Sequence, residues 1–262
     1  MQFNSVGFTI FGIPPYFFCA VVGLVAAVSL NIILVATKKY ELPKHMKNLI
    51  LSLVGMVLFA KLFGCLSGIY RAIGEGEAIT FNTIKNTGIV FYGGLLGLLL
   101  FYFVGTRVKL ISIEERNSIN LLAVSIPLFH AIARVGCFLA GCCYGIEYNS
   151  FGAIEYTMMH DGIESCAYRI PVQLIEAGLN ICIFVYLFSL AKRDDWDEKN
   201  ILVRYLVLYS CGRFLLEFIR GDTVRGVIYG VSFSQVISVL ILAGTLLSYI
   251  KKRNNLSKEN EL

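Results

Sequence analysis

The stretch HAIARVGCFLAGCCYG, residues 130–145, decides the fold of this chain. It begins as the end of an apolar helix that carries one cation, Arg134, and then breaks into glycines and cysteines. A charge within a membrane span costs roughly 2.5 kcal/mol or more, so it is normally retained only where it faces the protein interior and binds something. Arg134 therefore marks a candidate site inside a membrane protein.

The composition supports a membrane protein. Of the 262 residues, 56% are hydrophobic and 16% are charged, and the mean hydropathy is +0.70. Since no barrel-like alternation is visible, helices are the way to satisfy the backbone in lipid, and we expect an all-α membrane fold in a single domain, 1–262. Seven apolar blocks reach or approach the roughly 20 residues of a membrane span, near 16–37, 47–66, 88–105, 119–140, 171–191, 201–219 and 231–250.

The basic residues predict an orientation. Lysines and arginines gather after the first, third, fifth and seventh blocks, whereas the alternate connections, including a long polar loop at 146–169, hold far fewer. Because basic loops stay in the cytoplasm, we expect the N-terminus outside and the C-terminus in the cytoplasm. Lys38 and Lys39 follow the first block in place of a cleavage site, so this block is expected to be a retained span. Topology thus explains the net charge of +5, and nucleic acid is not an expected partner.

Polar residues of several blocks fall at one depth, near the outer surface. His130 and Arg134 are one helical turn apart and share a face. Two arginines at headgroup depth can hold a phosphate bidentately, and a nearby carboxylate can position an arginine or move a proton. We therefore expect a site for an anionic phospholipid headgroup, open to the outer leaflet. The candidate residues are Tyr16, Tyr92, Gly93, Gly94, His130, Arg134, Gln173, Glu176, Arg213, Glu217 and Arg220.

Each of these residues also has a structural interpretation. Tyr16 can be an interfacial anchor, and Gly93 can serve close packing of helices. The alternative for the Gly93-Gly94 pair is a helix start whose N–H groups hold an anion. His130 can be a hydrogen-bonded packing residue, and Arg213 with Glu217 can be an ion pair that only joins helices.

The eight cysteines divide into two groups. Cys19, Cys65, Cys182 and Cys211 fall inside expected spans and are expected to be small apolar packing residues. The others, Cys137, Cys142, Cys143 and Cys166, lie at or beyond an outer end, and their redox state stays open. Adjacent cysteines lack the usual Cys-x-x-Cys spacing of a metal site, so no metal or cofactor is expected, and a redox or metal site remains the minor alternative.

Four motifs in order carry a family resemblance. The run Arg134-x-Gly136-x-Phe138-x-x-Gly141-x-x-Tyr144-Gly145 resembles the pattern of bacterial prolipoprotein diacylglyceryl transferases. The segments 171–176 (PVQLIE) and 213–220 (RFLLEFIR), the glycine pair and Tyr16 follow in the order and spacing of that family. The resemblance implies a plasma-membrane enzyme without a metal or cofactor. It would move the diacylglyceryl group of phosphatidylglycerol to the lipobox cysteine thiol of a prolipoprotein, releasing glycerol phosphate.

The resemblance also implies residue roles. Arg134 and Arg213 would hold the lipid phosphate, Glu217 would orient Arg213, and Tyr16 and Gly145 would shape the pocket. The expected catalytic set is Arg134, Arg213, Glu217, Tyr92 and Tyr16. The expected substrate-binding set is Gly93, Gly94, His130, Gly136, Cys137, Cys142, Tyr144, Gly145, Gln173, Glu176 and Arg220.

This chain departs from the family pattern at three positions. Tyr92 stands where the family has a histidine, Cys137 where it has an asparagine, and Cys142 where it has an acidic residue. The task of activating the thiol then falls to Tyr92, to His130 or to no residue. Two alternatives stay open: a divergent transferase with another acceptor, and a non-catalytic protein that binds or transports phospholipid.

Overall fold

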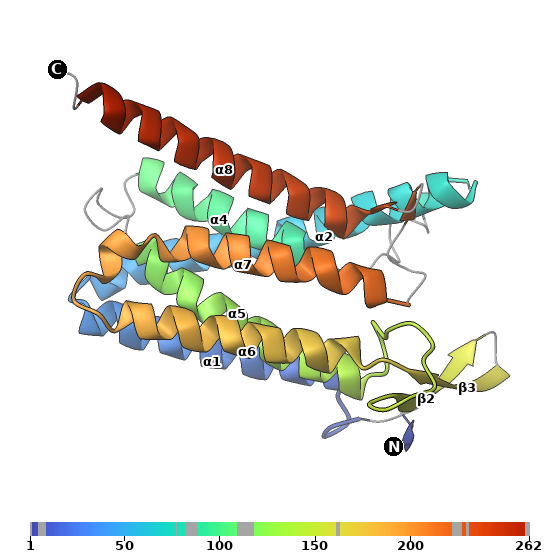
Figure 1. Cartoon of the computed structure of the whole chain (residues 1–262). Coiled ribbons are helices and arrows are strands. Elements are labelled where there is room, and N and C mark those ends of the chain that lie inside the picture. Colours follow the sequence, from blue (N-terminus) through green and yellow to red (C-terminus); the bar gives the residue numbers. More distant parts are fainter. Residues whose placement is uncertain are drawn as a thin grey trace.

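The computed structural model describes residues 2–4, 9–76, 78–81, 89–108, 118–160, 163–221, 227–228 and 231–259. Within these ranges the chain is mostly helical, and the long helices run alongside one another (Figure 1). They are α1 (Pro15–Thr37), α2 (Leu42–Glu75), α4 (Phe91–Arg107), α5 (Ser118–Leu139), α6 (Val172–Ala191), α7 (Ile201–Leu216) and α8 (Phe233–Glu259). The short 3-10 helices η2 (Trp196–Lys199) and η3 (Glu217–Ile219) flank α7.

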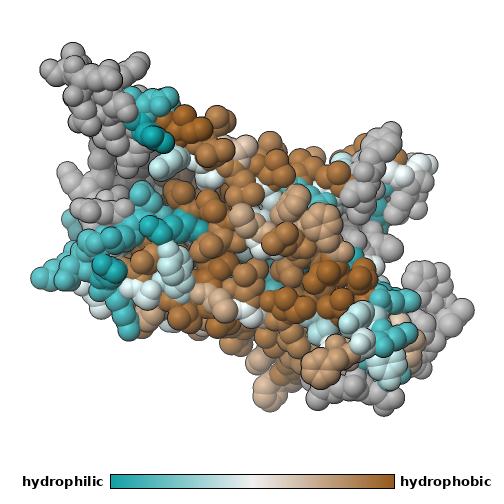
Figure 2. All heavy atoms as spheres, in the orientation of Figure 1, coloured by the Kyte–Doolittle hydropathy of each residue, from teal (hydrophilic) through white to brown (hydrophobic). Residues whose placement is uncertain are grey.

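The helices have the length and surface of membrane spans. Among the described residues, five helices are long and apolar enough to cross a membrane, namely α1, α2, α5, α6 and α8, and α4 is a shorter apolar helix. Figure 2 shows a broad hydrophobic band across the middle of the visible face, with hydrophilic residues toward both ends. An exposed apolar band of this size fits contact with lipid. The prediction of a mostly helical membrane protein is confirmed.

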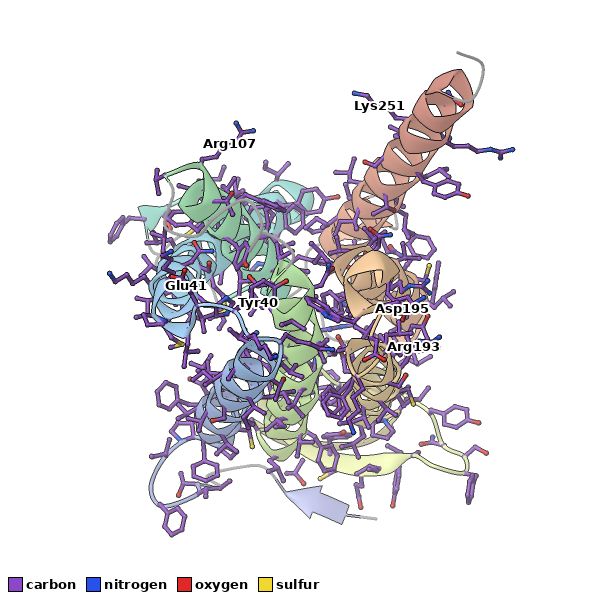
Figure 3. All side chains as sticks on the ribbon, turned by 90° about the vertical axis from the view of Figure 1, so that its left-hand side faces the viewer. Tyr40, Glu41, Arg107, Arg193, Asp195 and Lys251 are labelled. Carbon is purple, nitrogen blue, oxygen red and sulfur yellow. The ribbon has the colours of Figure 1, made fainter. Side chains whose placement is uncertain are left out.

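Basic connections gather at one end of the bundle. Figure 3 looks at this end and shows Glu41, Arg107, Arg193 and Lys251, which come from four different parts of the chain. Lys38 joins two of these connections because its Nζ donates to the carbonyl of Arg193 at 3.2 Å. The N-terminal strand β1 (Gln2–Asn4) and the hairpin of β2 (Ile154–His160) and β3 (Ile163–Arg169) lie at the opposite end (Figure 1).

Glycines allow α2 and α4 to pack backbone against backbone. A Cβ added to Gly97 would overlap the carbonyl oxygen of Gly55, and one added to Gly93 would lie 2.5 Å from the carbonyl oxygen of Phe59. Helix interfaces in membranes use small residues in this way. Gly93 therefore serves helix packing, the first of the two interpretations of the glycine pair. The other main helix contacts join α1 with α5, α5 with α6, α6 with α7, and α7 with α8.

Two helices run past the predicted ends of their spans. The second span was predicted near 47–66 with a loop beyond it, but α2 continues to Glu75 and ends at Gly76, whose φ is 69°. The helix continues because residues 67–73 contain no proline, and it stops where a glycine adopts the left-handed conformation. The last helix, α8, likewise continues through the basic tail to Glu259. Residues 82–88 of the predicted loop and third span lie outside the described residues.

A small sheet replaces part of the predicted outer loop at 146–169. Strands β2 (Ile154–His160) and β3 (Ile163–Arg169) form an antiparallel hairpin, and β1 (Gln2–Asn4) pairs with β2 in parallel. A second, two-stranded pairing joins β4 (Val227–Ile228) to β5 (Val231–Ser232) just before α8. The prediction of an all-α fold did not include these strands, because their polar residues also match an exposed loop.

Candidate functional site

The site begins where α5 ends. The helix stops at Leu139, and Gly141 adopts the left-handed conformation with φ of 67°. The Cys142 N–H donates to the carbonyl of Cys137 at 3.1 Å, and the Gly141 N–H donates to that of Phe138 at 3.0 Å. This pair of bonds is the Schellman motif, in which the chain reverses over the last helical turn. The reversal brings Cys142 back beside Cys137.

Buried polar side chains fix this turn from behind. Gln173, in the first turn of α6, donates from Nε2 to the carbonyl of Cys142 at 2.6 Å. The Tyr156 hydroxyl on β2 donates to Gln173 Oε1 at 3.2 Å. Burial raises the pKa of Tyr156 to about 12, so the phenol stays a neutral donor. The hairpin, α6 and the α5 turn are thereby locked together.

Gly145 is the point at which three segments meet. Its N–H donates to the carbonyl of Ile170 at 3.0 Å, and the Gly221 N–H donates to the carbonyl of Tyr144 at 3.1 Å. A Cβ on Gly145 would lie 2.5 Å from the Ile170 oxygen, so a larger residue would separate these segments. The same contact sets Arg220 opposite Gly145 in a β-bridge.

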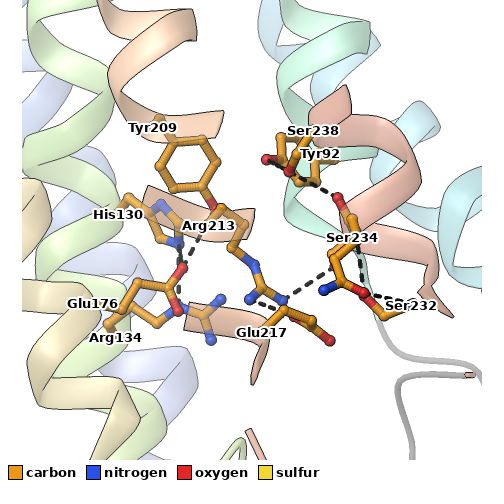
Figure 4. Close-up of polar contacts among 11 residues, drawn as sticks. Tyr92, His130, Arg134, Glu176, Tyr209, Arg213, Glu217, Ser232, Ser234 and Ser238 are labelled. Carbon is orange, nitrogen blue, oxygen red and sulfur yellow. Dashed lines mark hydrogen bonds and ion pairs between the residues drawn. The ribbon is translucent and has the colours of Figure 1, made fainter. Parts of the chain in front are cut away.

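Arg134 is held by a carboxylate from another helix. Its Nε lies 3.0 Å from Oε2 of Glu176 on α6 and donates to Nε2 of His130 at 3.2 Å. The other carboxylate oxygen, Oε1, is 3.5 Å from His130 Nε2 and accepts from the Tyr209 hydroxyl at 3.4 Å. Figure 4 shows this cluster, in which α5, α6 and α7 each contribute a side chain. Phe91 covers it by stacking on His130, with ring centroids 3.8 Å apart.

Arg213 is held by η3, which directly follows α7, and by α8. Its NH1 lies 2.6 Å from Oε2 of Glu217, and its NH2 donates to Ser234 Oγ at 3.1 Å. The hydroxyls of Tyr92 and Ser238 share a hydrogen bond of 2.6 Å, which joins α4 to α8 next to this pair (Figure 4). Both members of the Arg213–Glu217 pair are buried. An ion pair removed from water in this way needs such additional hydrogen bonds to be tolerated.

One cavity of about 1440 Å³ brings the two arginines together. Apolar side chains such as Leu24, Leu95 and Leu122 line much of its wall. A large apolar chamber with cationic groups among its lining residues suits a ligand that has an anionic head and a hydrocarbon body. The polar and cysteine residues that line it are Tyr16, Arg71, Tyr92, His130, Arg134, Cys137, Cys142, Cys143, Tyr144, Arg169, Tyr209, Arg213, Arg220 and Ser234, among others.

Several predicted site residues stand behind the cavity wall. Gly136 packs α5 on α1, since a Cβ there would lie 2.6 Å from Cys19 Cβ and 3.0 Å from Tyr16 Cα. This close approach sets Tyr16, which is 54% exposed, on the cavity lining. The residues of the predicted set that do not line the cavity are Gly93, Gly136, Gly145, Gln173, Glu176 and Glu217. Gly94 lines it, with its N–H bound to the carbonyl of Val90 at 3.1 Å.

Three thiols form the group that has the geometry of a metal site. Among the residues that the structure describes, Cys137, Cys142 and Cys143 have their sulfur atoms all within 4.8 Å of one another. Cys137 belongs to the last turn of α5, and the other two belong to the turn that follows. All three line the cavity.

Sequence reasoning missed Tyr209, Ser234 and Ser238 as members of the site. Tyr209 lies one turn before Arg213 and contacts Glu176, so a polar residue at that spacing was the available signal. Ser234 and Ser238 also lie one turn apart, at the start of α8. A serine in an apolar helix costs little free energy, so its presence in the sequence does not indicate a site.

The fold and cavity define a membrane protein with an amphipathic, cation-lined chamber. A family model described as prolipoprotein diacylglyceryl transferase matches residues 5–250, and the chain belongs to this family of membrane transferases. It is therefore a multi-pass bacterial membrane protein, and at the level of the family its chemistry is the transfer of a diacylglyceryl group in lipoprotein biosynthesis.

Curated relatives agree along most of the chain. Phosphatidylglycerol–prolipoprotein diacylglyceryl transferase 2 of Clostridium perfringens is 28% identical over 247 residues, covering 92% of each chain. The phosphatidylglycerol–prolipoprotein diacylglyceryl transferase of Enterococcus faecalis is 29% identical over 268 residues, covering 97% of this chain and 92% of its own. That of Clostridioides difficile is 29% identical over 183 residues, or 68% of each chain.

Proposed function

We propose that this protein transfers the diacylglyceryl group of phosphatidylglycerol to the thiol of a lipobox cysteine in prolipoprotein signal peptides. The observation that carries the proposal is the shared cavity of Arg134 and Arg213, which reach it from α5 and α7. Phosphatidylglycerol has one phosphate and two acyl chains, and the cavity offers guanidinium groups together with apolar walls. The family relationship supports the same substrates.

The two arginines stabilise the leaving group. When the substrate sulfur attacks the glycerol carbon, the carbon–oxygen bond breaks and the departing phosphate gains a second negative charge. Fixed positive groups aimed at developing charge stabilise it more than the ground state. Arg134 uses its Nε for Glu176 and His130, so its two amino groups are placed to bind phosphate oxygens. Glu217 orients Arg213 for the same task.

The attacking thiol must also lose its proton, and the cavity lining offers Tyr92 and His130. Tyrosine has a pKa of about 10 in water and is a poor base near neutral pH. The Tyr92 hydroxyl is already bound to Ser238. His130 Nε2 already accepts a hydrogen bond from Arg134. Both side chains position the site, and neither presents an unoccupied base.

The arrangement also supports a topology. We propose that residues 1–262 form one domain with seven spans in the plasma membrane. The N-terminus would lie outside the cell and the C-terminus on the cytoplasmic side. The basic connections shown in Figure 3 would face the cytoplasm. The site would then open to the outer leaflet, at the end where the β2–β3 hairpin lies (Figure 1).

Complementation tests the proposal. A bacterial strain depleted of its own transferase would express this protein, and mass spectrometry would look for thioether-linked diacylglycerol on a reporter lipoprotein. We expect product with the wild type and none with Arg134→Ala or Arg213→Ala. Cys211→Ser is the matched control, because Cys211 is exposed on α7 and lies outside the cavity lining.

Two results would overturn the proposal. Binding of phosphatidylglycerol without product on any acceptor would indicate a non-catalytic lipid-binding protein. Transfer to another acceptor, with no labelled lipoprotein, would indicate a divergent member of the family.

A further inference from the structure

The thiols of Cys137, Cys142 and Cys143 converge without the spacing that usually signals a metal site. The Schellman motif explains the first contact, because it places the side chain two residues beyond the helix end against that of the last turn. In this motif the two positions frequently hold apolar residues, whereas here they hold Cys142 and Cys137. Helix geometry thus makes a pair from residues five apart.

The third thiol arrives through an unusual backbone conformation. Cys143 has φ of 60°, in the left-handed region that L-residues rarely occupy. Such a conformation persists only where surrounding structure holds it. Gln173 supplies part of that restraint by binding the carbonyl of Cys142. The backbone is therefore held in the shape that keeps all three sulfur atoms within 4.8 Å of one another.

We propose that these three cysteines bind a zinc ion whose fourth position faces the cavity and takes the substrate thiol. Zinc–sulfur bonds of about 2.3 Å in tetrahedral geometry place ligand sulfurs about 3.8 Å apart. No two of the three sulfurs are farther apart than this spacing by more than about an ångström. Three protein ligands and one open position are the pattern of catalytic zinc, whereas structural zinc has four protein ligands. All three cysteines line the cavity in which the open position would lie.

The surrounding charges suit this occupant. Three thiolates and one zinc ion carry a net charge of −1, which becomes −2 with a bound substrate thiolate. Arg134 and Arg220 line the same cavity as the cysteines. Positive neighbours favour thiolates over thiols, and zinc is bound through thiolates. Arg134, which would hold the lipid phosphate together with Arg213, thus also balances the metal centre together with Arg220.

Zinc binding accounts for the deprotonation of the substrate thiol, for which Tyr92 and His130 offer no unoccupied base. A thiol that coordinates zinc loses its proton, here to water at the cavity mouth. The zinc-bound sulfur then attacks the glycerol carbon, a carbon–sulfur bond forms, and the carbon–oxygen bond to phosphate breaks. Glycerol phosphate leaves with the bonding electron pair, and nothing is oxidised or reduced. This role rests on the proposed function, whereas binding of the metal does not.

Metal analysis of the full-length protein in detergent tests the site. We expect about one zinc per chain in reduced wild type. The variants Cys137→Ser, Cys142→Ser and Cys143→Ser should each weaken zinc binding by at least about 100-fold, since even an outer partner of a metal ligand is worth 10- to 100-fold. Cys211→Ser is the control and should bind as the wild type does. Sulfur-to-cobalt absorption of the cobalt-substituted protein should increase with a lipobox cysteine peptide and not with its serine analogue.

The outcomes separate the metal site from the transferase. If the wild type binds zinc but forms no lipoprotein product, the metal site is supported and the proposed function is contradicted. If the variant with all three cysteines changed to serine has full activity, the proposed function is supported and the role of zinc in it is contradicted. If a variant fails to fold, alkylation of the reduced wild-type protein tests the site instead. Bound zinc should protect the three thiols from the alkylating reagent. Unprotected thiols at saturating zinc would overturn the site.

Discussion

The two arginines of the site are held in different ways. Arg134 pairs with Glu176 across a helix boundary, and the same carboxylate contacts His130 and Tyr209. Arg213 pairs with Glu217 in the next turn of its own chain segment and reaches α8 through Ser234. The first arrangement joins three helices through one carboxylate, whereas the second orients a single guanidinium. The comparison predicts that Glu176 mainly stabilises the fold and that Glu217 mainly orients the Arg213 guanidinium.

Glu176→Ala should have the largest effect. It leaves the part-buried Arg134 without its carboxylate and removes the shared partner of His130 and Tyr209. Breaking a buried ion pair from one side costs about 3–5 kcal/mol. We expect that loss in the free energy of unfolding, measured by denaturation in detergent, together with loss of activity. Glu176→Gln keeps the shape and should lose less. An alanine variant as stable as the wild type would contradict the structural role.

Arg213→Lys should separate activity from stability. Lysine keeps the positive charge near Glu217 but lacks the planar fork that reaches both Glu217 and Ser234. We expect transferase activity to fall by about 100-fold, the effect of losing one oriented donor to the transition state. Thermal unfolding should change far less than in Glu176→Ala. Equal losses of stability in Arg213→Lys and Glu176→Ala would contradict the difference proposed between the two arginines.

Glu217→Gln should have a smaller effect. The amide keeps an oxygen that can accept from the Arg213 NH1, now 2.6 Å from the carboxylate, but the charge is lost. Hydrogen bonds to charged groups exceed neutral ones by about 1–1.5 kcal/mol. We expect activity to fall by about tenfold, since 1.4 kcal/mol corresponds to that factor. Kinetics at several lipid concentrations would show the change. A complete loss would assign Glu217 a direct role in proton transfer.

Tyr92→Phe should have the smallest effect. The change removes the hydrogen bond to Ser238, whose hydroxyl still donates to the carbonyl of Ser234 at 2.8 Å. A single neutral hydrogen bond contributes about 1 kcal/mol to stability. Activity should fall by less than about tenfold in the lipoprotein assay. A loss above that limit would show that the phenol itself moves the proton.

The parts of the site that sequence reasoning found are those that are costly in lipid. Arg134, Glu176, Arg213 and Glu217 stand out because a charge in an apolar helix needs a reason. The i,i+4 spacing allowed the pairing of Arg213 with Glu217 to be predicted. The pairing of Arg134 with Glu176 could not be predicted, since these residues meet only through the packing of α5 on α6. Ser234 and the other serines carry no comparable signal.

The fold was predictable to a similar depth. Hydropathy locates the helices because each must satisfy its backbone in lipid. It does not reveal where a helix ends in water, so α2 was predicted too short. The thiol cluster depends on the left-handed conformation of Cys143, a residue type that does not favour it. Spacing alone therefore argued against a site that the folded backbone assembles.

The contact of Gly55 with Gly97 restricts how lipids travel. At that level even a methyl group has no room between α2 and α4. An acyl chain is wider than a methyl group, so lateral entry and exit through this wall are closed at that depth. If the proposed function holds, substrate lipid and lipidated product would then pass elsewhere, and the pair α2–α4 would serve as a fixed wall of the protein.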